Sequence, residues 1–99
     1  MLTIEHIKEV SLPLIEKYNI KKMDLFGSYA DGTATEESDA DFLVEFADED
    51  RSFIDAFCVK DELTKLLGLP VDVLKIPIIV SKHYKNFKIG KVVNIYEKP

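Results

Sequence analysis

Residues 25–46 read LFGSYADGTATEESDADFLVEF, and the rest of the chain can be understood around this stretch. It begins with the apolar end of a predicted strand, turns at Gly27-Ser28, and ends with Asp39-Ala40-Asp41 at the start of a second apolar segment. Side chains two positions apart on a strand point to the same face, so we expect Asp39 and Asp41 to present neighbouring carboxylates with Ala40 turned away. Such carboxylates repel each other unless a divalent cation lies between them, and Mg²⁺ prefers one or two carboxylates together with water and phosphate oxygens. The pair therefore predicts a magnesium site.

Gly27-Ser28 predicts a phosphate site beside this metal. If residues 23–26 form a strand and residues 28–30 begin a short helix, Gly27 allows a ligand to approach the backbone closely. Backbone N–H groups and the Ser28 hydroxyl could then donate hydrogen bonds to phosphate oxygens, which would also contact the metal. This combination of a held phosphate and a bound cation is typical of phosphoryl or nucleotidyl transfer.

The order of these residues resembles the signature of the nucleotidyltransferase superfamily that includes DNA polymerase beta. Gly27-Ser28 is followed after ten residues by Asp39, and Asp41 comes two positions later. The small size resembles that of the minimal nucleotidyltransferases. The resemblance implies an α+β, two-layer α/β nucleotidyltransferase fold in which helices pack on a mixed β-sheet. It also implies a single minimal nucleotidyltransferase domain over residues 1–99.

The same resemblance implies a third acid on a strand after the second long helix, and Asp72 matches that position. Taken alone, Asp72 between two valines is better interpreted as a surface residue on an edge strand. Beside a two-carboxylate site it becomes an expected component, as a metal ligand, as the general base for an incoming hydroxyl, or as both.

Minimal nucleotidyltransferases of this kind are commonly the antitoxin partners of HEPN-domain ribonuclease toxins, and members of the group transfer AMP from ATP to a toxin tyrosine. We therefore expect a magnesium-dependent enzyme that uses ATP and two Mg²⁺ ions and acts on a HEPN-domain protein. Asp39, Asp41 and Asp72 would be its catalytic residues and metal ligands. Gly27 and Ser28 would bind the nucleotide.

One position departs from the family pattern. Many minimal members have an arginine where this chain has Asp31, and an aspartate cannot neutralise phosphate as an arginine could. Asp31 therefore favours an alternative in which the chain keeps the fold and neutralises a partner by docking, without turnover. A small-molecule nucleotidyltransferase is a second alternative, although the sequence offers no separate acceptor domain.

Composition narrows the classes of protein further. The chain has 99 residues, of which 46% are hydrophobic and 31% charged, as expected for a soluble globular domain. A formal net charge of −5 argues against a long nucleic acid as partner. No apolar run reaches the roughly 20 residues of a membrane span, so we expect a cytoplasmic protein without a membrane partner. Cys58 is the only cysteine, which excludes an intrachain disulfide and a multi-cysteine metal site.

The remaining segments predict alternating helices and strands. Thr3 is placed to cap a first helix, which Pro13 should kink or divide and Asn19 should follow in a left-handed conformation. Residues 20–26 and 71–74 read as strands, and a helix between them should begin at a Ser52/Asp55 capping box and end at Gly68.

The C-terminal part is less regular. We expect a loop or edge segment over residues 76–80, a short helix over 81–88 and a last strand over 92–96. The only basic cluster consists of Lys82, His83, Lys85, Lys88 and Lys91. It could face a triphosphate or an acidic partner, or it could be a solvated helix face. The acidic residues Glu36, Glu37, Asp48, Glu49 and Asp50 are expected to be solvated.

Overall fold

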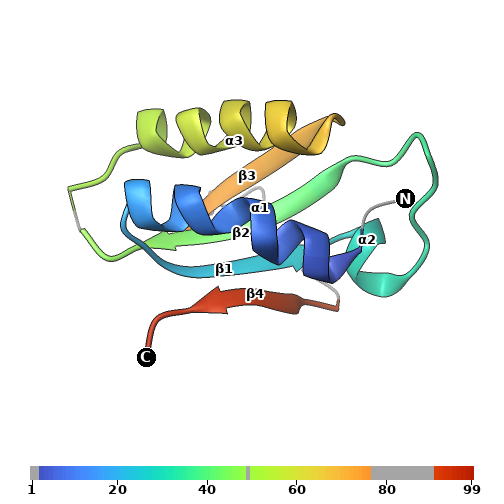
Figure 1. The fold of residues 1–99 in the computed structure, drawn as a ribbon, viewed down its shortest axis with the longest axis horizontal. Helices are drawn as coiled ribbons and strands as arrows, with labels where there is room; N and C mark the ends of the chain where they lie inside the picture. Colours follow the sequence, from blue (N-terminus) through green and yellow to red (C-terminus); the bar gives the residue numbers. More distant parts are fainter. Residues whose placement is uncertain (1–2, 49, 77–90) are drawn as a thin grey trace, which may run out of the picture.

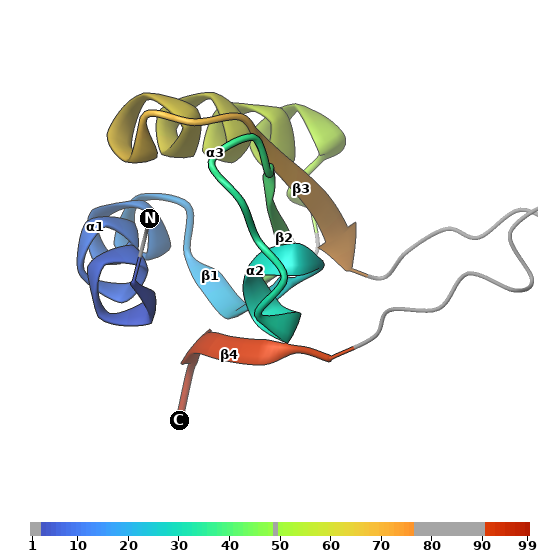
Figure 2. The same ribbon diagram turned by 90° about the vertical axis from the view of Figure 1, so that its right-hand side faces the viewer.

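The computed structural model describes residues 3–48, 50–76 and 91–99 as three helices and four strands. In chain order these are α1 (Ile4–Lys17), β1 (Ile20–Phe26), α2 (Ser28–Asp31), β2 (Ala40–Phe46), α3 (Phe53–Leu67), β3 (Val71–Ile76) and β4 (Val93–Glu97). The sheet order is β3-β2-β1-β4, with β2 and β3 parallel and the other neighbours antiparallel. Helices α1 and α3 lie on one side of this sheet (Figures 1 and 2). The predicted α+β fold with helices packed on a mixed sheet is therefore confirmed.

The first helix begins where the sequence predicts but is not divided. The Thr3 hydroxyl accepts a hydrogen bond from the His6 backbone N–H at 3.2 Å, and Asn19 follows the helix with a φ of 51°. The expectation that Pro13 might split the helix is wrong, because α1 runs continuously through that residue. Proline has no N–H, so the Glu9 carbonyl four residues earlier loses its usual helical hydrogen bond. Both Pro13 and Glu9 are exposed, so water can hydrate that carbonyl.

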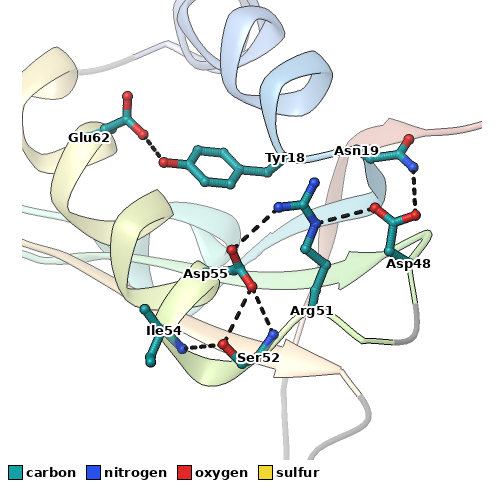
Figure 3. Close-up of polar contacts among 8 residues, drawn as sticks. All are labelled: Tyr18, Asn19, Asp48, Arg51, Ser52, Ile54, Asp55 and Glu62. Atoms are coloured by element: carbon teal, nitrogen blue, oxygen red, sulfur yellow. Dashed lines mark hydrogen bonds and ion pairs between the residues drawn. The ribbon is translucent and has the colours of Figure 1, made fainter.

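Helix α3 has both predicted ends. The Ser52 hydroxyl accepts from the Ile54 N–H at 3.2 Å, and the Asp55 carboxylate accepts from the Ser52 N–H at 2.9 Å (Figure 3). At the other end Gly68 has a φ of 72° and donates its N–H to the Thr64 carbonyl at 2.9 Å. The capping box and the glycine thus fix the length of α3 and bring the chain directly into β3.

The core lies between the sheet and the layer formed by α1 and α3. Leu25 and Phe42 are paired across β1 and β2, and both are fully buried in this core. The next pair along the ladder is Phe26 with Asp41. Because side chains alternate along a strand, Asp41 points to the face of the sheet that α1 and α3 do not cover.

The C-terminal expectations are met only where the structure describes the chain. Strand β3 continues to Ile76, two residues beyond the predicted end, and the last strand begins at Val93 rather than at residue 92. The expected loop over residues 77–80, the expected helix over 81–88 and most of the basic cluster lie outside the described residues. Lys91, the one described member of that cluster, is exposed. Among the described helices none has the length and apolar character required to cross a membrane.

Candidate active site

The turn from β1 into α2 packs closely against Asp41. Gly27 has φ 74° and ψ −153°, a conformation that side chains with a β-carbon rarely adopt. A β-carbon at Gly27 would overlap the Asp41 carboxylate oxygen Oδ2. Glycine is therefore required here both by the backbone angles and by the closeness of the carboxylate. The predicted strand, Gly-Ser turn and short helix are all present.

The parallel pairing of β2 and β3 sets two of the predicted acids side by side. Asp41 and Asp72 are register partners in this ladder. The Ala40 N–H also donates to the Pro70 carbonyl at 3.0 Å, so the two strands begin together. Asp41 is half-buried, whereas Asp72 is exposed. Two carboxylates far apart in sequence thus meet at one end of the sheet.

Asp39 differs from its predicted placement. It precedes β2 by one residue and is exposed, although it was expected to share the strand with Asp41. It nevertheless remains close enough to act on the titration of Asp41. Burial raises the pKa of the Asp41 carboxyl above its ordinary value, and the negative charges of Asp72 and Asp39 raise it further. The charges of Asp39 and Asp72 thus both act on Asp41, although Asp39 does not share its strand.

The donor set suits a hard divalent cation that also binds a substrate. Across residues 3–48, 50–76 and 91–99, no three acidic, histidine or cysteine side chains converge closely enough to complete a metal site by themselves. A cation held by one or two of these carboxylates would need oxygens from water or phosphate to complete its shell, which is the coordination that Mg²⁺ prefers. Its charge would also relieve the repulsion that raises the Asp41 pKa. The residues present thus fit a magnesium ion that arrives with a nucleotide.

Lys60 was not recognised from the sequence as a residue of this site. Its Nζ atom lies 3.5 Å from Asp72 Oδ1, and both side chains are about half exposed. A cleft of about 500 Å³ adjoins the pair and is lined by Asp39, Lys60, Thr64, Gly68, Leu69, Pro70, Val71 and Asp72. The sequence around Lys60 gave no signal of this role, because only the fold brings α3 beside Asp72.

The side chain of Asp31, the position that departs from the expected family pattern, forms hydrogen bonds within a local turn. Its carboxylate accepts hydrogen bonds from the Thr33 N–H at 3.0 Å and from the Thr33 hydroxyl at 2.6 Å. These bonds lower the pKa of Asp31, so it carries its negative charge at neutral pH. Asp31 therefore shapes the loop after α2 and offers no positive charge to a phosphate.

The acidic residues expected to be solvated do not behave alike. Glu36, Glu37 and Asp50 are exposed, as predicted, and Glu49 lies outside the described residues. Asp48 is partly exposed, and its carboxylate is also paired with neighbouring side chains (Figure 3). It accepts from Asn19 Nδ2 and from Arg51 Nε, each at 3.2 Å, and so ties the end of β2 to α1 and α3.

Comparison with known proteins agrees with this geometry. Residues 7–94 match the nucleotidyltransferase domain family, a span that includes Gly27, Asp39, Asp41 and Asp72. The chain belongs to this family. A Methanocaldococcus jannaschii relative, provisionally named a protein adenylyltransferase, is 42% identical to this nucleotidyltransferase over 73 residues, or 74% of this chain and 77% of the relative. The protein adenylyltransferase MntA of Thermococcus cleftensis is 37% identical over 78 residues, or 75% of this chain and 78% of the relative.

Solved structures share the fold. A chain from the crystal structure of a toxin–antitoxin complex with AMP-PNP superposes with a TM-score of 0.70, covers 98% of this chain and 75% of its own length, and is 21% identical. A chain from the complex of a tri-AMPylated HEPN toxin with its MNT antitoxin, from *Shewanella oneidensis*, gives a TM-score of 0.67 at 17% identity and covers 97% of this chain and 74% of its own. The predicted nucleotidyltransferase fold is therefore confirmed.

Proposed function

We propose that this nucleotidyltransferase transfers AMP from ATP, with Mg²⁺, to a tyrosine hydroxyl of a HEPN-domain partner and so acts as an antitoxin. The observation that carries the proposal is that Asp41 lies against the Gly27 turn and is the register partner of Asp72 on the neighbouring strand. Two neighbouring carboxylates, one of them beside a glycine turn that a phosphate could approach, support a cation and nucleotide site. The names of the relatives and the HEPN complex among the structural neighbours support a protein acceptor.

Each residue then has a defined task. Asp39 and Asp41 would hold the cations, and Gly27 and Ser28 would donate backbone and hydroxyl hydrogen bonds to the triphosphate. Magnesium bound there would neutralise the charge that develops on the phosphates. Asp72 would contribute to the metal site and accept the proton of the acceptor hydroxyl. The hydroxyl oxygen then forms a bond to the α-phosphorus, the bond from that phosphorus to the bridging oxygen breaks, and pyrophosphate leaves.

Intact mass spectrometry of the partner tests the proposal. The chain, ATP, Mg²⁺ and a HEPN-domain protein from the same genome would be incubated together, and AMP-sized additions to the partner are expected. The additions should disappear with Asp39→Asn/Asp41→Asn and persist with Glu36→Gln/Glu37→Gln. The second double variant changes the net charge equally on the exposed loop. Additions that persist in the Asp39→Asn/Asp41→Asn variant would refute the assigned roles.

Docking without turnover is a second candidate, and it is favoured by Asp31. In that case Asp39→Asn/Asp41→Asn would still neutralise the partner, and no addition would form with the unaltered chain. Neutralisation of the HEPN ribonuclease by each variant, measured with its RNA substrate, separates the two functions.

A further inference from the structure

The N-terminal half of α3 exposes an unusually large apolar surface next to the sheet. Phe53, Ile54 and Phe57 are 63%, 74% and 66% exposed, whereas such side chains are usually buried. Two of them line a cleft of about 380 Å³, which we call the α3–β3 groove and which consists of Phe53, Ala56, Phe57, Lys60, Val73, Leu74 and Lys75. The groove lies along the open edge of the described sheet, where β3 is the terminal strand (Figure 1).

The groove is continuous with the candidate active site through Lys60. This lysine lines both the groove and the cleft that contains Asp39 and Asp72. Helix α3 and strand β3 run in opposite directions (Figures 1 and 2). Because Phe53 and Phe57 belong to the first turns of α3 and Asp72 to the start of β3, they lie toward opposite ends of the shared surface. A ligand that lies along the edge of β3 would therefore pass from the apolar surface to the catalytic carboxylates.

The charge of the groove is opposite to that of the chain. Among the described residues its ionisable lining residues are Lys60 and Lys75, although the chain has a net charge of −5. Lys60 also lies 3.5 Å from Asp72, so Lys75 carries the lining charge that this ion pair does not offset. The Lys75 Nζ atom lies 5.6 Å from the centre of the Phe53 ring, so its positive charge sits directly at the apolar surface. Apolar side chains between two lysines are complementary to a polypeptide segment that is both hydrophobic and acidic.

We infer that the α3–β3 groove binds a hydrophobic, acidic segment of the protein acceptor and directs the acceptor hydroxyl toward Asp72. The inference rests on the proposed transfer to a protein. It assigns binding of the acceptor to the α3–β3 groove. Lys60, which lines both the groove and the cleft with Asp72, would lie between the bound segment and the reacting groups. In the described sheet β3 has a strand partner on one side only, so an acceptor segment could also pair with its other edge.

Peptide binding tests the groove independently of catalysis. The probes are two fluorescein-labelled peptides of equal length, each with one tyrosine and the same leucines, one carrying aspartates and the other lysines. Without nucleotide, fluorescence anisotropy should show that the acidic peptide binds the unaltered chain more tightly. Phe57→Ser and Lys75→Glu should each weaken this binding about tenfold, as expected for central contacts of an interface. The control variants are Leu12→Ser, which changes an exposed apolar residue on α1, and Lys65→Glu, which changes an exposed lysine elsewhere on α3. Neither should weaken binding of the acidic peptide to this extent.

Several results would overturn the inference. These are equal affinity for the two peptides, no binding of either, or equal losses in the control variants. Concentration-dependent self-association that Phe57→Ser abolishes would assign the groove to a second copy of the chain instead. In the transfer assay, Phe57→Ser should raise KM for the HEPN protein about tenfold and leave KM for ATP unchanged. If the unaltered chain transfers no AMP, the proposed function fails, and the peptide experiment still decides whether the groove binds such a segment.

Discussion

Replacing Gly27 with alanine should damage the active site much more than it damages the fold. The backbone at Gly27, with φ 74° and ψ −153°, lies in a region used almost only by glycine. Placing a side chain there costs about 1–3 kcal/mol. For a chain of this size 1 kcal/mol corresponds to roughly 5 °C in the unfolding midpoint, so we expect Tm to fall by about 5–15 °C.

The second consequence concerns Asp41. Because the new β-carbon would overlap Asp41 Oδ2, the carboxylate must rotate away from the turn. Rotation of a short side chain costs little stability, but a reacting group displaced by about 1 Å can lose about 100-fold in rate. We therefore expect transfer to fall by about two orders of magnitude in Gly27→Ala.

Gly32→Ala is the matched control. Gly32 also has a positive φ, 84°, but a β-carbon there meets nothing within 4 Å. Its backbone cost of about 1–2 kcal/mol should lower Tm to a similar extent, with transfer retained. Thermal unfolding by circular dichroism and AMP transfer would be measured on both variants below their midpoints. Equal transfer rates in Gly27→Ala and Gly32→Ala would refute the argument that Gly27 positions Asp41.

Three further predictions concern stability. Asp41→Asn should raise Tm at neutral pH, because the ionised form of a carboxyl with a raised pKa is disfavoured in the folded state. The difference in Tm between the variant and the unaltered chain should vanish below the ordinary pKa of 3.8, where Asp41 is protonated in both the folded and the unfolded state. Thermal unfolding followed by circular dichroism between neutral pH and pH values below 3.8 tests this prediction, and a difference in Tm that does not change with pH would contradict it. Ser52→Ala should cost about 1 kcal/mol through the lost cap of α3, and an unchanged denaturant midpoint would count against it. Tyr18→Phe should lower Tm, because it removes the hydroxyl that donates a hydrogen bond to Glu62 between α1 and α3. This bond also lowers the Glu62 pKa, so the loss of Tm should become smaller as the pH falls. A loss of Tm that grows on acidification would contradict this reasoning.

The features that sequence predicts well here are local. The Thr3 cap, the Ser52/Asp55 capping box and the left-handed Gly68 each depend on residues within a few positions, and all are found as predicted. Such interactions form between neighbours in the chain and need no knowledge of strand order. The acid pair was predicted only in part, because Asp41 lies on β2 as expected whereas Asp39 precedes the strand.

The features that sequence missed depend on contacts between distant segments. The proximity of Asp41 and Asp72 requires the parallel pairing of β2 with β3, and only the resemblance to a family suggested it. Lys60 meets Asp72 because α3 packs beside β3, which no local pattern encodes. Pro13 was expected to kink or divide α1, and the sequence alone could not show that the helix continues through this residue, where both Glu9 and Pro13 are exposed.

Metal-dependent nucleotide binding would test the central claim most directly. The binding of a non-hydrolysable ATP analogue, α,β-methylene-ATP, would be measured by calorimetry with and without Mg²⁺. The charge-matched variants Asp39→Asn/Asp41→Asn and Glu36→Gln/Glu37→Gln would be compared with the unaltered chain. We expect magnesium to strengthen binding to the unaltered chain and to the glutamine variant, and to have no effect on the asparagine variant. Binding that is independent of magnesium, or equally strengthened in the asparagine variant, would contradict the assignment of these aspartates as the metal site.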